Sequence, residues 1–476
     1  MQRTLLFKTL IVALLMLLIG VPLMMIQATI SDRMRFRDAA VRSIAADSVS
    51  EQTLLGPILV LPYSETYEEQ EIVDSVSKKT VARRYTLQHK HLVYPNDLKL
   101  TGTVDTDHRY RGIHKVLVYS GQHTMTGDFT LPLLANLARS VAGSELTAGQ
   151  PYIALGLSDT RGLRNFPSIL WNGKPFEFKQ ESKLRSFGSG LHAPLELMAL
   201  SSPEQVKFSL DLTIDGIERM HFVPIAKNNQ VSLTSKWPHP QFGGRFLPTP
   251  KERKIDQNGF SATWNISALA TSAQQQFSAL ELGRAVDVPA VVASAAVDVS
   301  AAPAAAMAMT ELDSFSVAFI EPINVYSQAD RAIKYGMLFV ALTFAAFFLF
   351  EILKSLPIHP IQYTLVGLAL ALFFLLLVSL SEHIAFAHAY LLAGGGCILL
   401  IAFYLSFVLQ SWQRGLGFGG GLCLLYGVLF GLLQSENNAL IMGSILLFAV
   451  LTSIMVVTRK VNWYQLGTAT SNKIAP

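Results

Sequence analysis

Residues 361–381 read IQYTLVGLALALFFLLLVSLS, a stretch without a charged side chain. A helix needs about 20 residues to cross a hydrocarbon core about 30 Å thick, and this stretch is long enough. Five further stretches of comparable length and apolarity surround it. The predicted spans are Lys8–Ile26, Tyr335–Leu353, Ile361–Ser381, Ala389–Leu409, Leu416–Leu433 and Ala439–Val457. The sequence therefore predicts an integral membrane protein with six transmembrane α-helices, one N-terminal and five C-terminal.

The composition of the chain agrees with this class. Hydrophobic residues make up 51% of the 476 residues, charged residues only 15%, and the mean hydropathy is +0.36. These values are shifted toward membrane proteins. The formal net charge of +4 is too small at this length to indicate nucleic-acid binding. We therefore expect the lipid bilayer as a partner and no nucleic acid.

The orientation is predicted from the basic residues that flank the spans. With six helices counted in order, all of them fall on one side: Arg3, Lys8, Lys354, Arg414, Arg459 and Lys460. The opposite short loops, around Glu382 and Glu436, carry no Lys or Arg. Because Lys and Arg in short loops mark the cytoplasm, both termini are predicted to be cytoplasmic and the long loop to face outward.

The first span could instead be a cleaved signal peptide. Its apolar core is longer than the usual 7–15 residues, and Ile26-Gln27-Ala28 is a poor small-x-small cleavage site. An uncleaved anchor is therefore expected.

Four regions follow from these observations. They are an N-terminal anchor (1–30), an outward domain (31–334), a five-helix bundle (335–457) and a cytoplasmic tail (458–476). Within the outward domain, residues 285–309 are rich in Ala and contain Pro289 and Pro303. This composition predicts a low-complexity loop. Both cysteines, Cys397 and Cys423, lie in spans, so no disulfide is expected in the domain.

The outward domain is predicted to be β-rich, with antiparallel sheets in a sandwich-like arrangement. Val206–Ile214 alternates apolar and polar residues without a break, which is typical of a strand with one buried face. Weaker alternation occurs at Ile58–Tyr63, Arg84–Tyr94, Leu98–Val104, Val116–Tyr119, Tyr152–Leu157, Gln230–Ser235, Phe260–Ile266 and Phe315–Ile320. Helices are expected only at Asp32–Ala46, Leu131–Val141 and Ile266–Leu280.

No catalytic signature is found in the sequence. It has no phosphate-binding Gly-rich loop, no His-Glu-x-x-His, no Cys-x-x-Cys and no Gly-x-Ser-x-Gly. Ser158 and Ser189 are better interpreted as turn residues. We therefore expect a protein that is not an enzyme, with no cofactor and no metal.

Polar residues at the membrane edge are the first candidates for function. Glu382 and His383, with His388 nearby, could serve a metal or a proton relay, although an interfacial cap is the favoured interpretation. Glu351 ends the second span near Lys354, at the spacing of an ion pair on a helix. A structural role is favoured for this carboxylate.

The candidate partner-binding residues are Trp237 and His239, in the run Trp237-Pro238-His239-Pro240. Two prolines restrict the local backbone and display an aromatic ring and an imidazole. The competing interpretation is a rigid turn that packs its own tryptophan.

Several motifs together resemble the CreD family of bacterial inner-membrane proteins. They cover nearly the whole chain in order: Gly56-Pro57-Ile58, Asp159-x-Arg161-Gly162, Trp237-Pro238-His239-Pro240, Phe246-Leu247-Pro248, Asp330-Arg331-Ala332-x-Lys334-Tyr335, His359-Pro360-x-Gln362-Tyr363, Leu380-Ser381-Glu382-His383 and Trp463-Tyr464-Gln465-Leu466. Residues 285–309 depart from the family, being longer and richer in Ala than its usual connection.

The resemblance implies an inner-membrane protein of cell-envelope integrity, with a periplasmic domain, expressed in stress responses and linked to β-lactam and colicin tolerance. It implies no enzyme activity and no catalytic residue. The expected function is therefore non-enzymatic, with an envelope protein or glycan as partner of the periplasmic domain. The alternatives are a transporter or lipid-handling protein that uses the C-terminal helices and, more weakly, a hydrolase of envelope polymers.

Overall fold

The computed structural model describes residues 2–74, 79–112, 114–198, 200–282, 312–319, 321, 325–354, 358–434 and 439–459. The chain divides into two compact units. The helical unit comprises Met1–Asp38 and Ile323–Pro476, and the β unit comprises Ala39–Pro322. Three predictions fall outside the described residues: the loop 285–309, most of the tail 458–476, and the side chain of Lys354.

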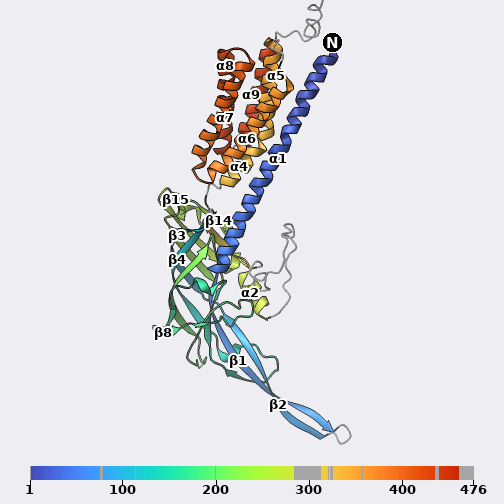
Figure 1. Cartoon of the computed structure of the whole chain (residues 1–476). Helices are drawn as coiled ribbons and strands as arrows, with labels where there is room; N and C mark the ends of the chain where they lie inside the picture. Colours follow the sequence, from blue (N-terminus) through green and yellow to red (C-terminus); the bar gives the residue numbers. More distant parts are fainter. Residues whose placement is uncertain are drawn as a thin grey trace, which may run out of the picture. The chain divides into compact units, whose positions relative to one another are not determined.

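Among its described residues, the helical unit contains the N-terminal part of one long helix and six further helices, coloured from yellow-orange to red in Figure 1. The long helix α1 continues into the β unit, because it extends without a break over Gln2–Asp47. The others are α4 (Val325–Lys334), α5 (Gly336–Lys354), α6 (Pro360–Ser381), α7 (Phe386–Val408), α8 (Trp412–Gln434) and α9 (Ala439–Thr458).

Four of the described helices are long and apolar enough to cross a membrane: α1, α6, α7 and α8. Helices α4 and α5 meet at a bend of 41° and together make a fifth candidate. Helix α9 is apolar over the shorter stretch Ile441–Ser453. The membrane class is therefore confirmed with four to five spans among the described residues.

Close backbone approach places α1 against the other helices of its unit. A Cβ atom added to Gly367 of α6 would lie 2.8 Å from the Ile19 side chain of α1 and 2.9 Å from that of Phe344 on α5. Small residues allow membrane helices to pack this closely. On α8, Gly415 and Gly419 face α7 in the same way, whereas a Cβ on Gly417 or Gly421 would meet no described atom within 4 Å.

The β unit is built on two mixed sheets. The first has the order β14-β17-β12-β1-β6-β10-β9, with β2 and β5 paired to β1; the second has the order β15-β16-β13-β3-β4-β11-β7-β8. The first-sheet strands are β1 (Gln52–Asp74), β2 (Lys79–Val93), β5 (Glu145–Ala148), β6 (Tyr152–Leu157), β9 (Lys179–Gln180), β10 (Gly190–Pro194), β12 (Arg219–Val223), β14 (Pro240–Gly244) and β17 (Phe315–Phe319). The second-sheet strands are β3 (Asp97–Arg111), β4 (His114–Leu131), β7 (Ser168–Trp171), β8 (Lys174–Glu177), β11 (Glu204–Ile217), β13 (Asn228–Ser235), β15 (Lys254–Asp256) and β16 (Gly259–Ser267).

The β-rich prediction is confirmed, but the expectation of antiparallel sheets needs a correction. Two strand pairs are parallel: β1 with β12, and β3 with β13. The other pairings are antiparallel, including β3 with β4 and β4 with β11. One apolar cluster contains residues of both sheets, such as Leu59 and Phe222 of the first and Phe129 and Leu210 of the second. The two sheets therefore share a core.

Two of the predicted helices of the β unit are wrong in whole or in part. Leu131–Val141 forms only the short 3-10 turn η1 (Leu134–Asn136), because Leu131 still pairs with β11. Ile266–Leu280 begins as the end of β16, continues as the 3-10 turn η4 (Ala268–Ala270) and becomes helical only in α2 (Ala273–Leu282). Two further 3-10 turns are η2 (Thr160–Gly162) and η3 (Pro250–Glu252).

A long hairpin of β1 and β2 runs from the pair Leu59–Val93 to the pair Asp74–Lys79. Its outer part stands clear of the other strands of its unit, in light blue in Figure 1. Strands β6 and β5 cover the other edge of β1 only as far as Thr66. The hairpin is therefore two-stranded beyond that point.

Candidate functional site

The polar contacts of helix α1 define the most extensive candidate site. Near its N-terminus, Lys8 forms an ion pair with Glu351 of α5. The Glu351 carboxylate also accepts hydrogen bonds from the Tyr363 hydroxyl, at 2.8 Å, and from the Ile358 backbone N–H, at 3.2 Å. Glu351 is only 5% exposed, so these partners replace the water that a carboxylate requires.

A second ion pair holds α1 farther along its length. The Arg33 Nε lies 3.3 Å from Glu382 Oε1, and the Tyr326 hydroxyl of α4 donates to the same oxygen at 3.2 Å. At about 1.5 Å per residue, Lys8 and Arg33 are about 38 Å apart along the helix. This distance exceeds the hydrocarbon thickness of about 30 Å, so both charged pairs can lie at the edges of a bilayer.

The polar residues predicted at the membrane edge, Glu382, His383 and His388, do not all share contacts. Glu382 has defined partners, whereas His383 and His388 are exposed. Among the described residues, no group of three or more His, Cys, Asp or Glu is arranged to hold a metal. The contacts of Glu382 fit the interfacial cap and give no support to the metal hypothesis. Glu351 contacts Lys8 of another helix, a partner that the sequence interpretation missed.

The C-terminal end of α1 lies in the β unit and is held by Arg161. The guanidinium donates to the Ala46 carbonyl at 2.6 Å and to the Ala45 carbonyl at 3.2 Å. The last carbonyls of a helix have no partner within it, and a cation there also favours the helix dipole. Asp159 orients Arg161 through hydrogen bonds of 2.6 and 2.9 Å.

We call Asp159, Arg161 and Gly162, with the helix carbonyls of Ala45 and Ala46, the α1 joint. A Cβ on Gly162 would lie 2.4 Å from the Asp215 carbonyl oxygen and 2.5 Å from the Gln52 side chain, so only glycine fits there. Burial raises the pKa of Asp159, but the hydrogen bonds from Arg161 and the Ser50 N–H outweigh it, so the pKa lies below its usual value.

The candidate binding residues Trp237 and His239 lie in the connection between β13 and β14. The Trp237 indole N–H donates to the His239 carbonyl at 3.1 Å, and the two rings lie edge to face with centroids 6.2 Å apart. Trp237 packs partly against the core, whereas His239 is exposed. His108 adjoins Trp237 with ring centroids 6.1 Å apart and contacts Glu321 at 3.1 Å. We call these four residues the Trp237 corner.

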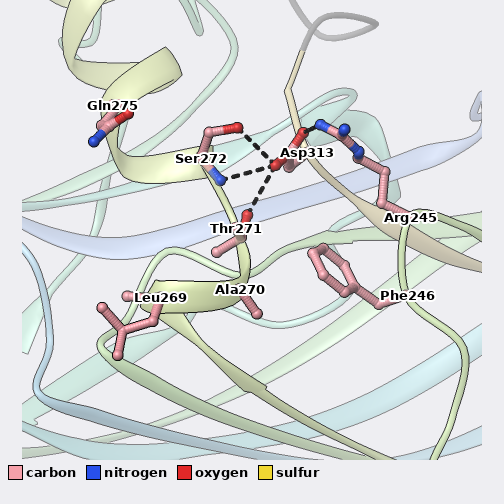
Figure 2. A pocket seen from close by; sticks show the side chains of 9 residues that line it. Arg245, Phe246, Leu269, Ala270, Thr271, Ser272, Gln275 and Asp313 are labelled. Carbon is pink, nitrogen blue, oxygen red and sulfur yellow. Dashed lines mark hydrogen bonds and ion pairs between the residues drawn. The ribbon is translucent and has the colours of Figure 1, made fainter.

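An open hollow lies beside the start of α2, where Figure 2 shows its lining. Arg245 forms an ion pair with Asp313, and Asp313 accepts hydrogen bonds of 2.9 Å from the Ser272 N–H and 3.1 Å from the Thr271 hydroxyl. Asp313 is 4% exposed. Burial raises its pKa, but the bonds from Arg245 and Ser272 dominate and lower the pKa to about 2. The carboxylate thus holds Thr271 and Ser272, the residues directly before α2, and the hollow has a structural explanation.

Comparison with known proteins identifies the family. The family model described as "Inner membrane protein CreD" matches residues 4–464. The chain belongs to the CreD family. It is 33% identical over 449 residues to the "Inner membrane protein CreD" of Escherichia coli (strain K12). The aligned residues cover 94% of this chain and 91% of that protein. The resemblance seen in the sequence is confirmed, and the chain is an inner-membrane protein with several membrane-spanning helices.

Some of the residues that carried the resemblance to CreD proteins lie at the contacts of α1 or at an irregularity of β1. Asp159, Arg161 and Gly162 form the α1 joint, and Glu382 binds Arg33. Gly56, in the first motif, has a φ of 105° at an irregularity in the pairing of β1 with β6. In this CreD chain, these motif residues therefore hold structural elements together.

Four participating residues were not predicted from the sequence as site residues: Lys8, Arg33, Tyr326 and Tyr363. A signal was available for some of them. Charged residues at both ends of an apolar helix need partners, and Glu351 and Glu382 are acidic residues at the ends of C-terminal spans. Tyr326 and Tyr363 carry no comparable signal, because a tyrosine near a membrane edge is common.

Proposed function

We propose that this chain is a non-enzymatic protein of cell-envelope integrity, whose periplasmic β unit binds an envelope component and is joined to the membrane helices by α1. Membership of the CreD family supports the envelope role. The proposed topology has six transmembrane helices, with α9 as the sixth, and the two sheets form a sandwich. Both termini are cytoplasmic, as the distribution of Lys and Arg favours.

The continuity of α1 is the observation that carries the proposal. One helix extends over Gln2–Asp47 and contributes to both compact units. Lys8 and Arg33 hold it within the helical unit, and Arg161 holds its end within the β unit. If a partner bound to the β unit moves this end of α1, the displacement would therefore be transmitted to the membrane helices through the contacts of Lys8 and Arg33.

The Trp237 corner is the surface that we propose for binding the envelope partner. It presents the exposed His239 imidazole beside a half-buried indole whose position is fixed by its own hydrogen bond. An envelope protein or a glycan are both compatible with such a surface, because aromatic rings and imidazoles pack on sugars as well as on side chains. The rival role of Trp237 is to pack the turn.

Complementation of a bacterium that lacks its own copy tests this surface. Trp237→Ala and His239→Ala are expressed separately, and survival under a β-lactam is measured together with protein level and membrane insertion. We expect His239→Ala to lose tolerance at normal protein level, with His383→Ala, an exposed histidine elsewhere, as the matched control. Full tolerance with His239→Ala would contradict the binding role; a fall in protein level with Trp237→Ala alone would indicate a structural role.

Photocrosslinking identifies the partner. A photoreactive residue at position 239 of the full-length protein, followed by mass spectrometry, is expected to give a specific envelope protein or glycan adduct. The same probe at position 383 serves as the control. Adducts that are the same at both positions would contradict a specific partner at the Trp237 corner.

The buried carboxylate of Glu351 favours a second candidate, a transporter or lipid-handling protein that uses the C-terminal helices. Ionisable groups within membrane segments are often functional. This candidate requires Glu351→Gln to abolish transport and requires the helices without the β unit to keep some activity. The ion pair with Lys8 supports an anchoring role for Glu351 instead.

A further inference from the structure

The outer part of the β1–β2 hairpin has two free strand edges. Within the described residues, β1 pairs only with β2 over Tyr67–Asp74, and β2 pairs with no strand other than β1. At about 3.3 Å per residue, the free edge of β1 is about 26 Å long. Free edges present unpaired backbone N–H and C=O groups, which are templates for another strand.

The two strands of this outer part differ in charge. From Tyr67 to Asp74, β1 carries four acidic residues and no basic one. Strand β2 carries Lys79, Arg83, Arg84 and Lys90 and no acidic residue. Within the hairpin, Glu68 lies opposite Arg84 and Glu69 opposite Arg83. One free edge therefore belongs to an acidic strand and the other to a basic strand.

Within the described residues, the outer part of the hairpin consists of two strands only. A two-stranded ribbon is marginally stable in water, and a third strand or a packed face is normally needed. The Tyr67 and Tyr85 rings stack with centroids 5.7 Å apart, but Tyr85 and Leu87 remain 36% and 37% exposed. An additional strand beside β2 would satisfy its backbone groups and cover these side chains.

We propose that a second copy of this chain supplies that strand, with the acidic β1 edge of one copy pairing with the basic β2 edge of the next. β1 and β2 run in opposite directions, so a neighbouring copy in the same orientation presents its β1 antiparallel to β2.

The opposite charges of the two strands favour an intermolecular ladder in the register of the hairpin itself. Glu69 of one copy then lies opposite Arg83 of its neighbour, and Glu68 opposite Arg84, as in the backbone register of each hairpin. Within one copy, Arg84 also forms an ion pair of 3.6 Å with Glu145 of β5. Such opposite charges across strands stabilise pairing, and like charges oppose it. The contact joins two different edges, so each copy keeps one edge free for a further copy, and the assembly is a row or a ring.

Disulfide trapping tests the contact and its register. Two differently tagged full-length chains are expressed together, one with Glu69→Cys and one with Arg83→Cys, and the mixed product is identified by its two tags. We expect a disulfide between them. The control pairs Glu69→Cys with Leu87→Cys, on the same face but four residues away, and gives at least fivefold less product.

A charge exchange provides the second test. Glu69→Arg and Arg83→Glu in one chain keep the pair within the hairpin but place like charges across a contact with the wild type. We expect the exchanged chain to capture its own kind from detergent extracts and to capture the wild type about fivefold less. Equal capture of the exchanged chain and the wild type would overturn the proposal. So would equal disulfide yields for the 69–83 and 69–87 cysteine pairs. If the exchanged chain captures neither its own kind nor the wild type, and β2 forms an adduct with another protein, this edge belongs to a different partner. That result would also overturn the proposal.

Discussion

The Arg33 Nε lies 3.3 Å from Glu382 Oε1. Arg33 follows Lys8 by twenty-five positions in the same helix, and Lys8 forms the other ion pair of that helix, with Glu351. Both acidic partners are more enclosed than the bases: the side chains of Glu351 and Glu382 are 6% and 10% exposed, against 38% and 41% for Lys8 and Arg33. Removing the base therefore leaves a carboxylate with too few partners, whereas removing both charges together does not.

The first prediction concerns this asymmetry at Lys8. Lys8→Met is expected to destabilise the helical unit by about 1–3 kcal/mol, because it leaves the buried Glu351 carboxylate with only the Tyr363 hydroxyl and the Ile358 N–H. The double variant Lys8→Met with Glu351→Gln is expected to recover at least half of that loss. Thermal unfolding of the full-length protein in nanodiscs measures both. A double variant no more stable than Lys8→Met would show that the pair is not the cause.

The sequence predicted the strands well because alternation is a local property. Val206–Ile214 was predicted as a strand, and β11 extends over Glu204–Ile217 with inward residues such as Phe208 and Leu210 buried. Which strands pair is not local. The parallel pairing of β3 with β13 joins residues about 130 positions apart, and no periodicity within either strand specifies it.

The same distinction applies to the sites. Glu351 and Glu382 were found because a carboxylate is conspicuous beside apolar spans, but the partner of Glu351 lies 343 positions away. The helix predicted at Leu131–Val141 was wrong for a related reason. The Ser140 and Val141 N–H groups donate to Glu65, at 2.9 and 2.8 Å, and not to a helix.

The second prediction concerns the α1 joint. Arg161→Ala removes the donor to the last carbonyls of α1, and Gly162→Ala places a methyl group 2.4 Å from the Asp215 carbonyl. Each is expected to destabilise the β unit by about 1–3 kcal/mol and to speed hydrogen exchange over Ala39–Asp47. Gly188→Ala is the matched control, because its Cβ would meet no described atom within 4 Å. If hydrogen exchange over Ala39–Asp47 is unchanged in Arg161→Ala, Arg161 does not hold the end of α1.

The third prediction concerns Glu65, whose carboxylate holds the segment before β5 against β1. It accepts hydrogen bonds from the Ser144 hydroxyl at 2.6 Å and from two backbone N–H groups, and these bonds lower its pKa to about 2. Its stabilisation is therefore complete above pH 4.5 and is lost as the pH falls toward 2. Glu65→Gln is expected to make Leu137–Ser144 cleavable by protease at neutral pH, where the wild type is resistant. Equal resistance of both proteins at pH 7 would contradict this role.

The fourth prediction concerns His123, whose ring is enclosed between the sheets. A Cβ on either Gly102 or Gly121 would lie 2.4 Å from the ring, so these two glycines provide its space. Neither ring nitrogen has a described hydrogen-bond partner, and burial lowers the pKa of His123 to about 4. The unfolded chain, with an ordinary pKa near 6.5, therefore binds a proton that the folded β unit excludes.

Stability of the β unit should consequently fall as the pH drops from about 6.5 to 4, by about 3 kcal/mol from this residue alone. His123→Met keeps an apolar side chain of similar size and should flatten this dependence, with His239→Asn, an exposed ring, as the control that keeps it. Urea unfolding of the full-length protein at pH 7 and pH 5, followed by fluorescence, measures the difference. If the loss between these pH values is the same in His123→Met and the wild type, the buried imidazole is not its source.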